Sequence, residues 1–321
     1  MDLRPLGRTG LTVSALGFGC GNVGGLMIRG SVAEQRAAVA RAIDSGITYF
    51  DTAPSYGDGR SEENLGRALR DLGAHERVVV GTKVRLAPEE LAAPGEAVRR
   101  SLEASLRRLG RERVDLLQLH NPIGAGSLPV EEALAGVADG MRQVIAAGLA
   151  RCAGFTGIGE TAALKRMIAS GSFDTVQAYF NAANPSAGFP GAAAGGHDFG
   201  GLIDDAARAG MGVLAIRVLA AGALSGTAER APLASPVGRG LVPGGDFADD
   251  LARTTRLAGI AAEGGLESTV ELAVRFALSK PGVSTALVGL SAQEQLEAAL
   301  RWADRGPLPT SVVERVVAVA R

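Results

Sequence analysis

The 321-residue chain has little of what marks several classes of protein. Its two cysteines, Cys20 and Cys152, are too few and too far apart for a disulfide framework or a zinc signature. No window approaches the ~18 uninterrupted apolar residues of a membrane span, and residues 1–10 lack the apolar core of a signal peptide. The formal net charge of -1 gives no reason to expect nucleic acid or an anionic membrane as partner. We therefore expect a soluble, cytoplasmic protein.

What the chain does contain is typical of a soluble globular enzyme. Hydrophobic residues make up 46% and charged residues 21%. Basic residues are scattered, and the segment VRRSLEASLRRLGRERV (residues 98–114) predicts a solvated helix face. Exposed helices of this kind often pair, so a homo-oligomer is possible.

Helix and strand patterns alternate from residue 31 onward. The pattern contains eight strands and no reversal that would mark a domain boundary, which favours one closed α/β barrel, a (β/α)8 TIM barrel, over residues 1–321. A β-hairpin is expected in residues 1–12 and an extra C-terminal helix in 311–321. The strands are expected at 13–20, 46–51, 78–84, 114–120, 151–157, 175–180, 212–219 and 284–290, and long, functional loops at 121–128, 181–200 and 220–246.

Glycines after the first barrel strand could be mistaken for a dinucleotide-binding fingerprint. The spacing of Gly17, Gly19, Gly21, Gly24 and Gly25 does not match G-x-G-x-x-G leading into a helix. The acid expected about 20 residues further on, at the tip of a second strand, is also absent. We therefore disfavour a Rossmann fold.

Four polar residues follow successive strands. Asp51 stands where an apolar run stops, Tyr56 lies in the Pro/Gly-bounded loop after it, and Lys83 and His120 end the next two strands. Each alone has a structural explanation: a strand-end cap, a packed loop aromatic, a surface lysine or a hydrogen-bonded core histidine. Because strand ends share one site in such a barrel, their joint appearance points to chemistry.

The four side chains together make a tuned general acid. A free phenol has a pKa of about 10, and an ammonium group beside it favours the phenolate and lowers that pKa. A carboxylate behind the ammonium keeps the lysine charged and in place, while an imidazole can donate to a carbonyl oxygen. We predict a phenolic proton donor, Tyr56, aimed at a C=O group.

The segments that carry these residues resemble the aldo-keto reductase superfamily. They are RPLGRTGLTVSALGFG, GITYFDTAPSYG, GTKV and LLQLHNP, and the resemblance spans essentially the whole chain. It implies a (β/α)8 barrel that binds a nicotinamide cofactor and moves a hydride between it and a carbonyl or alcohol carbon. It also implies that Tyr56 is the proton donor, that Lys83 and Asp51 tune it, and that His120 orients the substrate oxygen.

The same resemblance suggests a nicotinamide site. Thr156 and Gly157 replace the family's Ser-Asn pair, so one hydroxyl is kept and one side chain is lost. Gln177 matches a glutamine that reaches the carboxamide, and Ile216 stands where an aromatic ring often stacks on the nicotinamide. Arg217, which follows, is either a ligand of a phosphate or substrate anion or a structural salt bridge at the rim.

The phosphate and adenosine ends are implied by the segments after strands seven and eight. In LAAGALSG, backbone amides around Leu219, Gly222 and Leu224 would hold the pyrophosphate, and small residues let the chain approach closely. After strand eight, Gly289, Ser291 and Gln295 are the corresponding cofactor-binding candidates.

The choice between NAD and NADP depends on a basic residue. Leu290 and Ser291 occupy positions where the family places a base for the 2′-phosphate, and Ala298 and Ala299 replace a Glu-Asn pair. NAD is therefore slightly favoured, unless Arg217 or the long loop supplies the charge. Sugar 1-dehydrogenases and pyridoxal dehydrogenases, which use NAD, share the TG and VG pairs after strands five and eight.

The substrate is predicted only by class. The loops that would form the pocket wall have few aromatic residues and many Ala, Gly and Ser, which suits a roomy or polar aldehyde, ketone or sugar. An aldose or pyridoxal dehydrogenase working in the oxidative direction is the alternative. A non-catalytic sensor or scaffold subunit that binds nicotinamide nucleotide is a second alternative. A lyase or isomerase is disfavoured, because Lys83 is the only barrel-end lysine and no acid/histidine cluster suits a metal.

Overall fold

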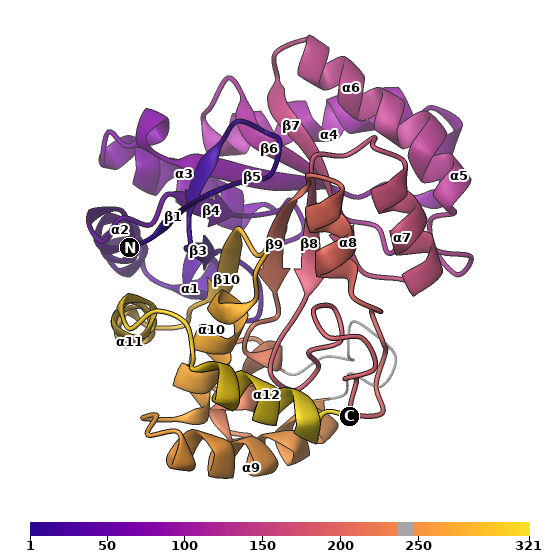
Figure 1. Cartoon of the computed structure of the whole chain (residues 1–321). Helices are drawn as coiled ribbons and strands as arrows, with labels where there is room; N and C mark the ends of the chain where they lie inside the picture. Colours follow the sequence, from indigo (N-terminus) through magenta and orange to yellow (C-terminus); the bar gives the residue numbers. More distant parts are fainter. Residues whose placement is uncertain (237–246) are drawn as a thin grey trace.

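The computed structural model describes residues 1–236 and 247–321, and within these ranges eight parallel strands close into a barrel (Figure 1). Neighbouring strands follow the order β10-β3-β4-β5-β6-β7-β8-β9. The predicted (β/α)8 barrel is therefore confirmed. The strands are β3 (Leu16–Gly19), β4 (Tyr49–Asp51), β5 (Val79–Val84), β6 (Val114–Leu119), β7 (Ala150–Gly157), β8 (Thr175–Tyr179), β9 (Gly212–Ile216) and β10 (Thr285–Gly289).

Helices surround the barrel on the outside (Figure 1). The first long one starts with a capping box, because Ser31 Oγ accepts from the Glu34 amide at 3.3 Å while the Glu34 carboxylate accepts from the Ser31 amide at 2.8 Å. The surrounding helices are α2 (Val32–Asp44), α3 (Arg60–Asp71), α4 (Pro94–Leu109), α5 (Val130–Glu132), α6 (Ala138–Ala146), α7 (Thr161–Ala169), α8 (Leu202–Arg208), α10 (Thr269–Ser279), α11 (Gln293–Asp304) and the predicted C-terminal helix α12 (Thr310–Val319). A π-helical segment, Ala133–Val137, joins α5 to α6. None of the helices in the described ranges has the length and apolar character needed to cross a membrane.

The N-terminal hairpin closes one end of the barrel. β1 (Leu3–Pro5) pairs antiparallel with β2 (Thr12–Ser14), and the hairpin loop packs so tightly that a Cβ on Gly7 would lie 2.1 Å from the backbone nitrogen of Gly212. Gly212 begins β9, so the hairpin covers the N-terminal ends of the strands. The C-terminal ends are left for a site, as in other barrels of this type.

The boundary between the hairpin and the first barrel strand differs from the expected one. The hairpin was expected to end at residue 12 and a strand to run over 13–20, but Val13 and Ser14 belong to the hairpin and β3 begins at Leu16. The chain turns between them, where Ser14 Oγ donates to the Leu16 carbonyl at 2.7 Å. The apolar pattern runs through this turn without a break, so the sequence did not indicate where the hairpin ends and the barrel strand begins.

The segment after β9 differs most from expectation. The expected strand 212–219 ends at Ile216, because Arg217 takes a left-handed backbone conformation with φ 59°. The expected loop 220–246 begins with a 3₁₀ segment, Ala220–Ser225, and its residues 237–246 lie outside the described ranges. Two helices were not predicted: α1 (Leu26–Arg29) and the longer α9 (Phe247–Glu263), whose buried face includes Thr254, Leu257 and Ile260.

The barrel interior is filled just below the site by Tyr49, which is fully buried. Its ring fits because the strands on either side carry glycine: a Cβ on Gly81 would lie 2.2 Å from the Tyr49 hydroxyl, and one on Gly17 would lie 3.3 Å from the Tyr49 ring. Alternate residues of a strand share a face, so Asp51 points inward above Tyr49. The neighbouring Phe50 points outward and stacks on Phe18 with ring centroids 5.2 Å apart.

Candidate active site

The four predicted residues lie together at the C-terminal ends of three adjacent strands. Asp51 ends β4, Tyr56 lies in the loop after it, Lys83 is in β5 and His120 directly follows β6. The strands pair in the order β4-β5-β6. The His120 amide donates to the Val84 carbonyl at 2.7 Å, which fixes the height of the imidazole relative to the lysine strand.

Asp51 and Lys83 form a buried ion pair. Their relative exposures are 4% and 1%, and Lys83 Nζ donates both to Asp51 Oδ1 and, at 2.8 Å, to the Thr52 carbonyl. Burial lowers the pKa of Lys83, but the negative charge of Asp51 and the hydrogen bonds to Asp51 and Tyr56 outweigh it, so the net shift is upward. The lysine therefore stays an ammonium group at neutral pH.

Tyr56 lies beside this ammonium group, with Lys83 Nζ 4.8 Å from the centroid of its ring. Burial raises the pKa of the Tyr56 phenol, and the opposing effect of Lys83 offsets only part of that rise. Lys83 lowers the pKa of the phenol, as expected, but desolvation of the phenolate outweighs this effect, so the net shift is upward. The phenol is protonated at neutral pH and can donate its proton.

His120 faces Tyr56 edge-on, with ring centroids 6.0 Å apart and an interplanar angle of 88°. Burial, followed by the positive charges of Lys83 and Arg85, lowers the pKa of His120 to about 3. The imidazole is therefore neutral at physiological pH. It can donate one N–H to a substrate oxygen but is not itself a proton source.

Three further donors converge on the second carboxylate oxygen of Asp51. Oδ2 accepts from the Tyr49 hydroxyl at 3.2 Å, from Gln118 Nε2 at 3.1 Å and from Gln177 Nε2 at 2.7 Å. Sequence reasoning missed Gln118 and Tyr49 as parts of the site. The two-residue period of a strand could have identified Gln118. It lies two residues before His120, so both side chains share one face, and it is the register partner of Lys83.

Gln118 carries an energetic cost that a purely structural residue would avoid. Its side chain is fully buried, its Nε2 is used by Asp51, and its Oε1 has no hydrogen-bond partner in the described part of the chain. An unpaired buried acceptor costs about 1–3 kcal/mol. A residue kept at such a cost next to Asp51 points to a role in holding that carboxylate.

Replacing Gln118 with leucine should separate stability from activity. We expect the free energy of unfolding to change by no more than about 1 kcal/mol, because the lost bond to Asp51 is offset by the removal of the unpaired acceptor. Turnover should fall on the order of tenfold, because Asp51 loses one of the groups that orient it. Chemical denaturation and steady-state kinetics measure the two effects. A stable variant with undiminished kcat would show that Gln118 does not position Asp51.

The loop that carries Tyr56 is held by contacts from the loop after β3. Asn22 Oδ1 accepts from the Gly57 amide at 3.0 Å, and Ser61 Oγ donates to the Cys20 carbonyl at 2.9 Å. A Cβ on Gly21 would lie 3.7 Å from Cε2 and Cζ of the Tyr56 ring. A larger side chain there would cover the phenol, so Gly21 keeps the proton donor accessible.

The predicted nicotinamide residues gather at the ends of β7, β8 and β9. Thr156 Oγ1 donates to Gln177 Oε1 at 3.4 Å, and both side chains are buried. Gly157 has no room for a side chain, because a Cβ there would lie 2.8 Å from the Gln177 carbonyl. Ile216 is half-buried and pairs in register with Tyr179. This set offers a hydroxyl, an amide oxygen and an apolar surface, which fits a carboxamide-bearing ring.

The predicted phosphate loop has an unusual backbone. Ala220, Ala221 and Gly222 follow one another with φ 46°, 58° and 100°, a left-handed run that alanine rarely adopts and that is characteristic of strained functional loops. Leu219 begins this turn, and its carbonyl accepts from the Gly222 amide at 2.7 Å and from the Leu224 amide at 3.3 Å, while the Leu224 side chain is buried in the core.

Arg230, which sequence reasoning did not single out, lies over the phosphate loop. Its Nη1 donates to the Ala221 carbonyl at 2.6 Å, and a Cβ on Gly222 would lie 2.6 Å from the same nitrogen. The loop therefore has small residues and a cation of its own, which fits an anionic ligand.

At the predicted adenosine end, the candidate side chains bond within the protein. Ser291 Oγ donates to the Gly24 carbonyl at 2.6 Å, and Gln295 Oε1 accepts from the Ser291 amide at 2.8 Å, while Gly289 is exposed. Residues 289–291 provide no basic side chain, and Leu290 is buried.

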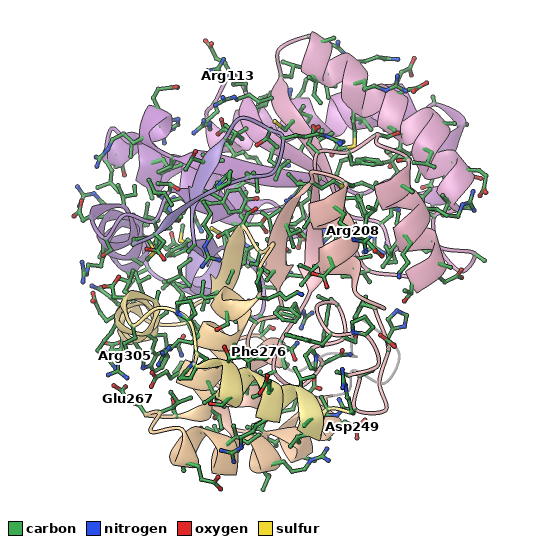
Figure 2. All side chains as sticks on the ribbon, viewed as in Figure 1. Arg113, Arg208, Asp249, Glu267, Phe276 and Arg305 are labelled. Atoms are coloured by element: carbon green, nitrogen blue, oxygen red, sulfur yellow. The ribbon has the colours of Figure 1, made fainter. Side chains whose placement is uncertain are left out.

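The two nearby basic residues are engaged elsewhere, as expected from their positions. Lys280 Nζ lies 2.7 Å from Asp204 Oδ1, and Arg301 Nη2 donates to Glu267 Oε2 at 3.1 Å. Figure 2 shows Glu267 and Arg305 together on the outside of the molecule, where Arg305 also pairs with Glu267 and ties α11 to the start of α10. Glu267 also lines a cavity together with Ser225 and Gly226, at the end of the predicted phosphate loop.

Comparison with known proteins agrees with the geometry of the site. The model of the aldo/keto reductase family matches residues 15–321. The chain belongs to this family. Its members use nicotinamide cofactors, and this aldo/keto reductase is an oxidoreductase of the same kind. The roles of individual site residues stay predictions.

Among curated relatives, L-galactose dehydrogenase of Arabidopsis thaliana is 31% identical over 306 residues, which cover 92% of this chain and 86% of the relative. Pyridoxal 4-dehydrogenase of Microbacterium luteolum is 40% identical over 149 residues, 37% of this chain and 43% of the relative. Among solved structures, the holo form of aldo-keto reductase AKR11C1 from Bacillus halodurans superposes with a TM-score of 0.74 at 23% identity, covering 100% of this chain and 97% of that one. That structural likeness supports the fold.

No group of three or more His, Cys, Asp or Glu side chains within residues 1–236 and 247–321 is arranged to hold a metal ion. The groups that the barrel mouth offers for chemistry are the Tyr56 phenol, the His120 imidazole and the Asp51–Lys83 pair, beside the residues that fit a nicotinamide.

Proposed function

We propose that this aldo/keto reductase transfers a hydride between NAD or NADP and the carbonyl or alcohol carbon of an aldehyde, ketone or sugar, with Tyr56 as the general acid/base. The observation that carries the proposal is the buried Asp51–Lys83 pair beside a protonated phenol and a neutral imidazole. Thr156, Gln177 and Ile216 would hold the nicotinamide, and the loop at residues 219–226 the phosphates. The cofactor supplies or accepts the hydride when it is bound.

The side chains of the chain carry the proton. In reduction, the Tyr56 hydroxyl gives its proton to the carbonyl oxygen, and the N–H of His120 holds that oxygen in place. The phenolate that remains is stabilised by the Lys83 ammonium group, whose own charge is maintained by Asp51. In oxidation the phenolate takes the alcohol proton, so turnover in that direction rises with pH as the phenol ionises.

The competing hypothesis is a non-catalytic nicotinamide-nucleotide sensor or scaffold subunit. Placing an ion pair in the barrel interior costs several kcal/mol of desolvation per ion, and a binding protein gains nothing from aiming it at a phenol. The test is a panel of aldehydes, ketones and sugars assayed with both cofactors in both directions. Binding of NADH or NADPH without turnover of any compound would favour the sensor.

The oxidative alternative differs from the proposal only in the direction of hydride transfer, which would run from substrate to cofactor. The names of two relatives, L-galactose dehydrogenase and pyridoxal 4-dehydrogenase, describe oxidation of L-galactose and of pyridoxal. The same four residues would serve an aldose or pyridoxal dehydrogenase working with NAD. The panel decides between them by comparing kcat/KM for each carbonyl compound with that for its reduced or hydrated partner.

We expect NAD to be preferred over NADP. A charge-assisted hydrogen bond contributes about 1.5–3 kcal/mol, so a site without a base for the 2′-phosphate loses roughly tenfold or more in preference for NADP. Residues 289–291 supply none, and Lys280 and Arg301 are paired elsewhere. Fluorescence titration with NADH and NADPH at equal, low salt measures the ratio. Tenfold tighter binding of NADPH would contradict the prediction and show that another residue supplies the charge.

A further inference from the structure

Arg217 is held in an unusual conformation at the barrel mouth. It follows the last residue of β9 and has φ 59°, a left-handed conformation that arginine rarely adopts. Two loops fix its backbone, since its carbonyl accepts from Asn181 Nδ2 at 3.1 Å and from the Ala220 amide at 2.7 Å. These contacts determine where the side chain leaves the backbone.

The guanidinium group of Arg217 has no hydrogen-bond or ion-pair partner among the described residues, although the side chain is only half exposed. Other partly buried arginines are satisfied: Arg4 donates to the Val283 carbonyl at 2.9 Å, and Arg253 donates to Asp250 at 2.8 Å. Burial lowers the pKa of Arg217, and the negative charge of Asp250 opposes that shift. The Asp250 carboxylate, however, forms its ion pair with Arg253. The structural salt bridge considered for Arg217 is therefore not formed with any residue in 1–236 or 247–321.

The free charge acts on the proton donor. The positive charge of Arg217 lowers the pKa of Tyr56 and of Tyr179, opposing the larger upward effect of burial on each phenol. A substrate carbonyl must lie within hydrogen-bond reach of Tyr56, and Arg217 directly follows β9 at the same end of the barrel. The phosphate loop, in contrast, has Arg230 on its Ala221 carbonyl. Arg217, at the barrel mouth, thus keeps a guanidinium group that no described residue binds.

We propose that Arg217 binds an anionic group of the substrate, a carboxylate or a phosphate, so that the enzyme acts on carbonyl compounds or sugars that carry a negative charge. This rests on the proposed oxidoreductase function. A guanidinium group suits the task because its planar fork donates two parallel hydrogen bonds to either oxyanion. An unpaired, half-buried cation would then gain its partner only when substrate binds.

The test compares charged and neutral substrates of the same shape. The pairs are 4-carboxybenzaldehyde with its methyl ester, and glyceraldehyde 3-phosphate with glyceraldehyde. In Arg217→Met the ratio of kcat/KM for the anionic over the neutral member should fall at least tenfold, mainly through KM, and Arg217→Lys should recover part of it. Arg36→Met is the matched control, because Arg36 is an exposed arginine on α2 and its loss should leave the ratio unchanged. An unchanged ratio in Arg217→Met would overturn the proposal.

Binding measurements distinguish the substrate from the cofactor as the source of the anion. Calorimetry with 4-carboxybenzaldehyde on protein saturated with NAD should show at least tenfold weaker binding for Arg217→Met, with the dissociation constants of NADH and NADPH unchanged. If cofactor binding weakens as much as kcat/KM falls, Arg217 belongs to the cofactor phosphates and the proposal is wrong. If the wild-type protein turns over neither these four compounds nor any other member of the panel, the proposed function fails. The calorimetric comparison still decides whether Arg217 binds the anion.

Discussion

Replacing Tyr56 with phenylalanine will lower kcat by a factor on the order of 10² or more, because the substrate oxygen loses its proton donor. The phenol is the one group at the site suited to that role. His120 is neutral, with a pKa lowered to about 3 mainly by burial, and the Lys83 ammonium group is bound to Asp51 and to the Thr52 carbonyl. Steady-state kinetics with the best carbonyl substrate of the panel measures the effect.

Two controls keep the Tyr56→Phe result specific. The dissociation constants of NADH and NADPH should barely change, because Tyr56 lies on the β4–α3 loop and the cofactor candidates lie at the ends of β7, β8, β9 and β10. The ring remains, so its edge-on contact with His120 is kept. Turnover close to that of the wild type would disprove the role of Tyr56 as the general acid.

Replacing Lys83 with methionine should damage both stability and turnover. Removing one partner of a buried ion pair leaves Asp51 as an uncompensated charge and costs about 3–5 kcal/mol of the free energy of unfolding. Lys83 also opposes the effect of burial on Tyr56, so its loss raises the pKa of the phenol further. Oxidative turnover, which needs the phenolate, should then require a higher pH, and the pH profile of kcat in that direction measures the shift.

A double variant separates the two effects of Lys83. In Asp51→Asn/Lys83→Met no buried charge is left unpaired, so most of the lost stability should return. Turnover should stay low, because the phenolate still lacks its ammonium neighbour. If the double variant regained both stability and turnover, Lys83 would be a structural residue only.

The sequence alone determined the barrel and the four residues at its mouth. Eight strands of alternating or continuous apolar residues alternated with helical patterns, and parallel strands joined by helices close most readily into a barrel. Asp51, Tyr56, Lys83 and His120 were found because each stands at the end of a strand or in the loop that follows it, and strand ends meet at one face whatever the side-chain packing. The helix α9 escaped prediction because its buried face includes Asp250 and Thr254 among the apolar residues, which weakens its pattern.

Only the tertiary structure decided how the charges at this face are balanced. The pKa of the Tyr56 phenol depends on how far burial raises it and how far the charge of Lys83 lowers it. The contacts of Gln118 and Gln177 with Asp51 depend on how β4, β6 and β8 are placed in the barrel. Arg217 forms no ion pair with Asp250, because the Asp250 carboxylate pairs with Arg253, which lies one helical turn further along α9. Such outcomes follow from distances between residues far apart in the chain, and electrostatic energies change steeply with those distances.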